Sequence, residues 1–115
     1  MQAMNGFSND YWGWGGEDDD LYSRTILARL NVTRYPENIA RYKMIKHEKE
    51  SSNPDNPCRF KLMSLTITRF NNDGLSSLRY KLISLEKQAL YTRILVDLEE
   101  DVERKRLKNQ VPSCS

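Results

Sequence analysis

Long hydrophobic runs are absent from this 115-residue chain, and that absence limits what the chain can do. A membrane-spanning helix needs about 20 consecutive, mostly apolar residues. No stretch approaches that length, and residues 1–6 do not show the charged-then-apolar pattern of a secretory signal. We therefore expect no membrane segment in this chain and, as written, no means of entering the secretory pathway.

A large charge of one sign is also missing. The 18 basic residues nearly balance the 16 acidic ones, which leaves a formal net charge of +2. A charge this small does not by itself favour nucleic acids or membrane surfaces as partners. Hydrophobic residues make up 38% of the chain and charged residues 30%, values that are ordinary for one small soluble domain.

Cysteine is scarce, with only Cys58 and Cys114 present. A disulfide between them is possible, but we expect two free thiols because Cys114 lies one residue from the end of the chain. The triplet Asn31-Val32-Thr33 fits the acceptor pattern for N-glycosylation. Such triplets also occur by chance, so this one is compatible with a lumenal location and does not prove it.

Local patterns predict alternating helices and strands joined by polar loops. Acidic residues at the start favour a helix over 17–30, and period-2 alternation favours a strand over 77–86. The remaining expectations are a loop over 5–16, a short strand over 38–46, a loop over 48–57, a helix over 60–70, a turn over 71–74, a strand over 90–98 and a charged, solvated helix over 99–108.

The most unusual segment runs from Tyr11 to Asp20 and combines two tryptophans, three glycines and four consecutive acids. Glycines let the backbone approach a ligand closely. Aromatic faces beside carboxylates are typical of sugar-binding sites, because the C–H face of a sugar packs on the ring while its hydroxyls bind the acids. The alternative is structural, since acidic residues often begin a helix without any functional role.

Two further pairs could carry chemistry. Met44 and His47 lie three residues apart and offer a thioether and the only imidazole, although such a pair is usually unrelated to metal binding. Arg59 and Phe60 offer fixed donors and an apolar wall, although a helix start with a buried Phe explains them equally well.

Together these segments resemble the beta-1,4-galactosyltransferase family, which includes invertebrate members that transfer N-acetylgalactosamine. The resemblance begins at Asn5-Gly6-Phe7 and is strongest in the run from Tyr11 to Asp20. Further matching segments follow in the family's order and spacing: 41–47, 56–60, 73–78 and 90–92. The resemblance covers residues 1–98, and residues 99–115 are a charged C-terminal extension.

The resemblance implies an α/β fold, namely the C-terminal portion of a GT-A nucleotide-diphospho-sugar transferase domain. It also implies an inverting hexosyltransferase that moves galactose or N-acetylgalactosamine from a UDP-sugar to the 4-hydroxyl of N-acetylglucosamine on glycans. Family members act in the Golgi apparatus as membrane-anchored enzymes. The alternative is a non-catalytic carbohydrate-binding or interaction module, derived from the family by truncation.

Site residues follow from the same resemblance. Asp18 matches the general base, Trp14 and His47 match donor-binding residues, and Met44 and His47 match ligands of Mn2+. The acceptor-binding matches are Gly16, Glu17, Asp18, Asp19, Arg59 and Phe60, with Met63 as a further wall of the acetamido pocket. Residues 46–60 match the family's mobile loop, which closes over the bound donor.

This sequence departs from the family pattern upstream. The family's third metal ligand comes from an Asp-x-Asp motif, and no such motif precedes residue 17 here. The strands that hold uridine are also missing. We therefore expect the isolated chain to be inactive, with an open sheet edge that favours aggregation.

Overall fold

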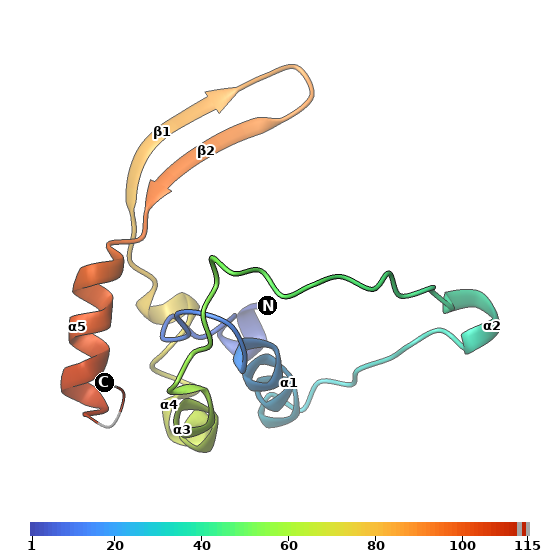
Figure 1. Ribbon diagram of the computed structural model, residues 1–115, viewed down its shortest axis with the longest axis horizontal. Coiled ribbons are helices and arrows are strands. Elements are labelled where there is room, and N and C mark those ends of the chain that lie inside the picture. The colour runs from blue at the N-terminus through green and yellow to red at the C-terminus, as the bar shows by residue number, and fades with distance from the viewer. Residues whose placement is uncertain (113, 115) are drawn as a thin grey trace.

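The computed structural model describes residues 1–112 and residue 114. The helices and strands, in chain order, are η1 (Gln2–Met4), α1 (Glu17–Leu27), α2 (Glu37–Ala40), α3 (Arg59–Ser64), α4 (Thr66–Arg69), η2 (Leu75–Ser77), β1 (Lys81–Lys87), β2 (Thr92–Asp97) and α5 (Glu100–Gln110). Helices α1, α3 and α4 form a central body, beside which α5 stands (Figure 1). The β1–β2 hairpin and the segment carrying α2 extend from this body in different directions.

The two strands form an antiparallel hairpin in which Lys81 pairs with Asp97 and Lys87 with Thr92. A register irregularity lies between Leu82 and Ser84. Both strands were predicted, β1 from its alternating pattern, but β1 begins at Lys81 rather than at residue 77, and residues 75–77 form the 3-10 helix η2. Among the described residues the hairpin is the whole sheet, so its two outer edges are unpaired.

The expected strand over 38–46 is wrong. Residues 37–40 form the short helix α2, and residues 41–50 have no regular secondary structure. A strand requires a partner to pair with, and none of the described strands reaches this segment. The apolar pattern from Ile39 to Met44 was therefore insufficient evidence for a strand.

Helix predictions were correct in place but not in length. Helix α1 ends at Leu27 rather than at residue 30, and Arg29 adopts a left-handed conformation with φ 54°. The helix expected over 60–70 is divided at Leu65 into α3 and α4. The loop over 5–16, the turn over 71–74 and the helix in the charged tail are confirmed.

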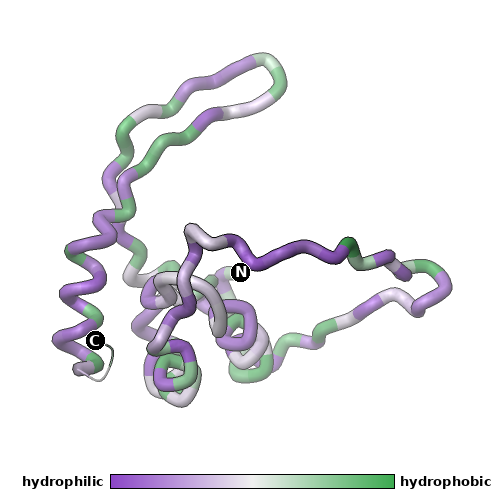
Figure 2. Tube along the Cα trace, viewed as in Figure 1, coloured by the Kyte–Doolittle hydropathy of each residue, from purple (hydrophilic) through white to green (hydrophobic). Residues whose placement is uncertain are grey.

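The apolar core is small and lies between α3 and α5. Its buried members are Cys58, Leu62, Leu107 and Val111. A disulfide joins Cys58 to Cys114, so the expectation of two free thiols is wrong. Helix α5 is hydrophilic over most of its surface (Figure 2), yet it is only partly solvated, because Leu107 and Glu103 are buried against the body.

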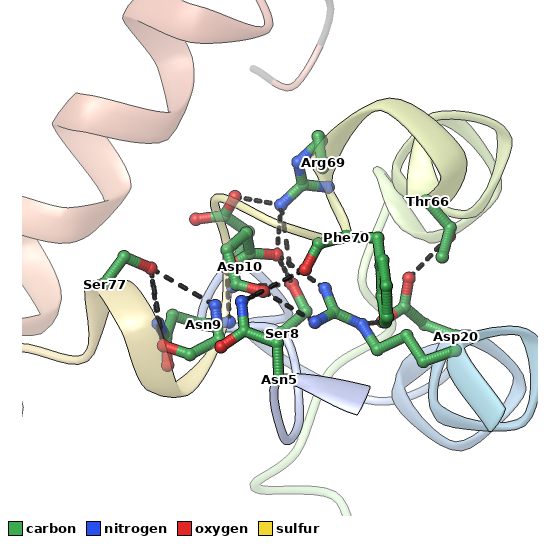
Figure 3. Close-up of polar contacts among 12 residues, drawn as sticks. Asn5, Ser8, Asn9, Asp10, Asp20, Thr66, Arg69, Phe70 and Ser77 are labelled. Carbon is green, nitrogen blue, oxygen red and sulfur yellow. Dashed lines mark hydrogen bonds and ion pairs between the residues drawn. The ribbon is translucent and has the colours of Figure 1, made fainter. Parts of the chain in front are cut away.

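A buried polar network also joins the elements of the body, beside the small apolar core. The fully buried Arg24 donates from Nε to Asp20 at 2.6 Å and from Nη1 to the carbonyl oxygen of Asp73 at 2.6 Å. Thr66 donates to the other oxygen of Asp20 at 2.5 Å. Figure 3 shows the contact between Thr66 and Asp20, which joins α4 to α1, and the Arg24 bond to Asp73 joins α1 to the turn before η2.

The network continues to the N-terminal loop and to α5. Arg69 pairs with both Asp10 and Asp73, and Arg106 of α5 donates to Asp10 at 2.6 Å. Burial, followed by the nearby charge of Asp73, raises the pKa of Asp10 above its usual value. A buried carboxylate must be paired to remain charged. By pairing with Asp10, Arg69 and Arg106 hold in place the loop that precedes the signature segment, residues 11–20.

Candidate functional site

The signature segment and the start of α3 enclose a hollow of about 380 Å³. Its lining comes from three stretches of the chain: the loop before α1, the first turn of α1, and α3. The lining residues are Trp14, Gly15, Gly16, Glu17, Asp18, Asp19, Arg59, Phe60 and Met63. The structure therefore brings together every residue that the sequence assigned to acceptor binding, and Trp14 as well.

Gly16 permits the close approach of α1 and α3 that forms the hollow. It precedes α1 with φ 95°, a left-handed conformation that favours glycine. A Cβ atom at this position would lie 2.9 Å from both the Cβ of Arg59 and the Cε1 of Tyr11. A larger residue here would push the two helices apart, so this glycine has a steric reason to be present.

Three of the four consecutive acids face the hollow and solvent. Glu17, Asp18 and Asp19 are exposed in the first turn of α1, where the positive end of the helix dipole stabilises negative charge. Asp18 Oδ1 accepts a hydrogen bond of 3.0 Å from the Asp19 amide. These carboxylates are accessible to a ligand, as a proton acceptor must be.

The fourth acid, Asp20, has a different role. It is buried and forms an ion pair with Arg24, four residues later in α1. The ion pair was not predicted, because the four acids form one continuous run in the sequence. The signal was present, because an Asp and an Arg at positions i and i+4 of a helix are neighbours.

Arg59 and the aromatic rings form the opposite wall. The Arg59 guanidinium carbon lies 4.8 Å from the centre of the Phe60 ring and 6.0 Å from that of Trp14. Its Nη1 donates to the carbonyl oxygen of Asn56 at 3.1 Å. The hollow thus places acids opposite a cation that is flanked by apolar rings, a combination that can bind both hydroxyl groups and the C–H face of a sugar.

The end of the polar loop, residues 48–57, is hydrogen-bonded to the backbone of Trp14. The Trp14 amide donates to the Pro54 carbonyl at 2.8 Å, and the Asn56 amide donates to the Trp14 carbonyl at 3.0 Å. Lys49 Nζ lies 4.4 Å from the centre of the Trp14 ring and pairs with Asp55, and this hydrogen bond lowers the pKa of Asp55. Lys49 and Asp55 were not predicted as site residues, because neither belongs to a recognisable local motif.

Met44 and His47 lie outside the hollow, in the segment without regular structure. Met44 is 90% exposed, and His47 Nδ1 lies 3.0 Å from the Glu48 carbonyl oxygen. Among the described residues no three His, Cys, Asp or Glu side chains are grouped to hold a metal. Mn2+ prefers oxygen ligands. A thioether and one imidazole therefore do not make a manganese site on their own.

Comparisons with known proteins identify the relatives of this chain. Residues 1–48 match a family model described as the N-terminal domain of galactosyltransferase. The chain is 47% identical over 98 residues to beta-1,4-galactosyltransferase 3 of Bos taurus and 44% identical over 95 residues to beta-1,4-galactosyltransferase 2 of Cricetulus griseus. These matches cover 85% and 83% of this chain, and 25% and 26% of the relatives.

Solved structures give the fold. The catalytic domain of Drosophila beta-1,4-galactosyltransferase 7, solved with xylobiose, superposes with a TM-score of 0.55 at 25% identity. A mutant of the same enzyme, solved with manganese, UDP-Gal and xylobiose, gives a TM-score of 0.54 at 23% identity and bears on the fold alone. Each match covers 99% of this chain and 48% of the solved chain.

The fold is therefore that of a portion of a GT-A nucleotide-sugar transferase domain, with both helices and strands as expected. The chain belongs to the beta-1,4-galactosyltransferase family. It spans about a quarter of the length of the curated relatives it matches. The assignments of individual site residues, and the boundary at residue 98, stay predictions.

Proposed function

We propose that this chain supplies the acceptor side of an inverting hexosyltransferase, which moves galactose or N-acetylgalactosamine from a UDP-sugar to N-acetylglucosamine on a glycan. The hollow between α1 and α3 carries this proposal, because it gathers the acids, the arginine and the rings in one place. The family membership supports the reaction class. The solved relative at 25% identity was bound to xylobiose, which supports a sugar acceptor.

In the proposed reaction Asp18 is the general base. The 4-hydroxyl oxygen of N-acetylglucosamine attacks the anomeric carbon of the donor sugar, and the bond from that carbon to the UDP oxygen breaks. The hydroxyl proton passes to the Asp18 carboxylate, and UDP leaves with the bonding electron pair. Glu17, Asp19 and the Gly16 backbone would position the acceptor, while Arg59, Phe60 and Met63 would hold its acetamido group.

Metal binding is a separate part of the proposal. The family resemblance assigns Met44 and His47 to Mn2+, and His47 also to the donor. Met44 is exposed, and no group of three His, Cys, Asp or Glu side chains is assembled for a metal among the described residues, so further ligands would be needed. The disulfide supports an oxidising compartment, consistent with the Golgi lumen as the proposed location.

A transfer assay tests the proposal. The chain would be joined to the remaining portion of a family member and supplied with Mn2+, an N-acetylglucosamine acceptor, and UDP-galactose or UDP-N-acetylgalactosamine. Asp18→Asn should lower kcat by about 10²–10⁴-fold while the acceptor KM changes little. Asp101→Asn on the exposed face of α5 is the matched control. A folded joined protein without activity on either donor would contradict the proposal.

A second candidate is a non-catalytic carbohydrate-binding module. It is favoured by one observation: the acceptor-side hollow is formed within the chain, whereas the metal ligands are not assembled there. Binding of N-acetylglucosamine by the bare chain, without Mn2+ or UDP, would support this function. Binding only in the joined protein with donor present would support the transferase.

A further inference from the structure

The triplet Asn31-Val32-Thr33 has no part in the proposed transfer reaction. The chain has nine asparagines, and only Asn31 is followed two residues later by Ser or Thr. The intervening residue is Val rather than Pro, as the acceptor pattern requires. The sequence alone leaves the triplet as a chance match, so its structural setting decides whether it can act as an acceptor.

The triplet lies in an accessible segment. Helix α1 ends at Leu27, and the left-handed Arg29 turns the chain away from the helix. Residues 30–36 form neither helix nor strand, and every residue from 29 to 39 is exposed. A modifying enzyme must surround its acceptor side chain, so an exposed segment free of regular structure is the kind of substrate it can bind.

The disulfide is an independent observation about where the chain matures. Cys58 and Cys114 are separated by 56 residues and are joined in the folded chain. Such bonds form in the oxidising lumen of the secretory pathway and are rare in the cytosol. N-glycosylation of Asn-X-Ser/Thr triplets takes place in the same compartment, so the pattern, its exposure and the disulfide agree.

The position also leaves the hollow free. The segment between α1 and α2 runs away from α3, α4 and α5 (Figure 1). None of residues 29–39 lines the hollow between α1 and α3. A bulky, hydrated glycan attached to this segment would therefore project into solvent without covering Asp18 or Arg59.

From these observations we infer that Asn31 is a site of N-linked glycosylation. The co-substrate is an oligosaccharide joined through a diphosphate to a lipid. The side-chain nitrogen of Asn31 forms a bond to the anomeric carbon of the oligosaccharide, and the bond from that carbon to the diphosphate oxygen breaks. The lipid diphosphate leaves with the electron pair, and the nitrogen loses one proton to the glycosyltransferase that catalyses the step.

The test is to produce the full chain behind a cleavable signal sequence in eukaryotic cells, and to treat it with a peptide N-glycanase. We expect a larger species that the enzyme converts to the unmodified size, leaving a carboxylic acid at position 31. Asn31→Gln and Thr33→Ala should each abolish the larger species, whereas Thr33→Ser should retain it. Asn38→Gln is the matched control, because Asn38 is equally exposed but lacks the hydroxyl residue.

Entry into the lumen is checked in the same experiment. Ala40→Thr converts Asn38-Ile39-Ala40 into a second acceptor triplet, so in an Asn31→Gln background it reports whether the chain reaches the glycosylation machinery. Modification at Asn38 in that variant, together with no modification of the wild-type chain, would overturn the inference. Loss of the larger species in both Asn31→Gln and Thr33→Ala, with retention in Thr33→Ser, supports it. Because the readout is mass, it is independent of transferase activity.

Discussion

Arg24 is the residue on which the buried network depends most. Its guanidinium has no exposed surface and contacts Asp20 and Asp73, two residues that are themselves buried. Replacing it with Met leaves the buried Asp20 without its counter-charge and Asp73 paired with Arg69 alone. Breaking a buried pair in this way costs about 3–5 kcal/mol. We therefore expect Arg24→Met to lower the free energy of unfolding by that amount.

Chemical denaturation followed by circular dichroism measures this loss. Arg41→Met is the matched control, because Arg41 is exposed in the segment without regular structure and should change stability by less than about 0.5 kcal/mol. Equal midpoints for Arg24→Met and Arg41→Met would show that the network does not stabilise the fold.

Asp10 and Asp55 should respond to pH in opposite directions. Burial, and then Asp73, raises the pKa of Asp10 in the folded state, so between the unfolded and folded pKa values the native chain binds more protons. Its contribution to stability therefore falls as pH rises through this window. The hydrogen bond from Lys49 lowers the pKa of Asp55, so its contribution is lost as pH falls toward the folded pKa.

The measurement compares Asp10→Asn and Asp55→Asn with the wild type by urea denaturation at several pH values on either side of 4. The wild type minus Asp10→Asn difference in unfolding free energy should decrease with rising pH, and the Asp55→Asn difference should increase. Two differences that change in the same direction would contradict these assignments.

At the scale of elements, the polar loop is held to the signature segment by few contacts. Two backbone hydrogen bonds join Trp14 to Pro54 and Asn56, and the Lys49 ammonium lies over the Trp14 ring. An exposed cation–π contact contributes about 0.5–1 kcal/mol. We expect Lys49→Met to weaken the attachment and lower hydrogen-exchange protection of the Trp14 and Asn56 amides by about two- to fivefold.

Lys46→Met provides the matched control, because Lys46 is exposed just before this loop and makes no cation–π contact with Trp14 among the described residues. Its amide protection should equal that of the wild type. If both variants show the same protection as the wild type, Lys49 does not hold the loop.

The elements also show what the sequence could and could not predict. The acidic start of α1 and the alternation in the hairpin are local signals, and both elements were found. The disulfide was missed because Cys58 and Cys114 are 56 residues apart, so only the docking of α5 brings them together. The strand assigned to 38–46 was wrong, because strand formation depends on a distant partner that a local apolar pattern does not reveal.

The candidate site joins residues from two separate parts of the sequence, and their roles stay predictions. The run from Trp14 to Asp19 and the pair Arg59–Phe60 were identified from sequence and line one hollow. Their proximity could not follow from spacing, because it depends on the tight packing at Gly16. Met44 and His47 were assigned by resemblance alone, and the described chain does not bring them to the hollow.

At the scale of the whole molecule, many large apolar side chains are exposed, several of them in the hairpin. Adjacent strand residues point to opposite faces of a sheet, yet Ile94 and Leu95, neighbours in β2, are 60% and 43% exposed. Figure 2 shows apolar residues along both strands of the hairpin. Among the described residues no helix is long and apolar enough to cross a membrane. Exposed apolar side chains such as those of the hairpin favour association with another protein surface.

We expect the bare chain to bind a hydrophobic dye strongly and to self-associate at high concentration, because both faces and both edges of the hairpin are open. Joined to the remaining portion of a family member, the same residues should be covered, and dye fluorescence per molecule should fall.

Leu82→Lys together with Ile94→Lys should reduce self-association of the bare chain, since both side chains are exposed in the hairpin. Val102→Lys, an exposed apolar position in α5, is the control outside the hairpin. Light scattering and dye titration check these outcomes. A bare chain that stays monomeric with little dye binding would show that the hairpin surface needs no partner.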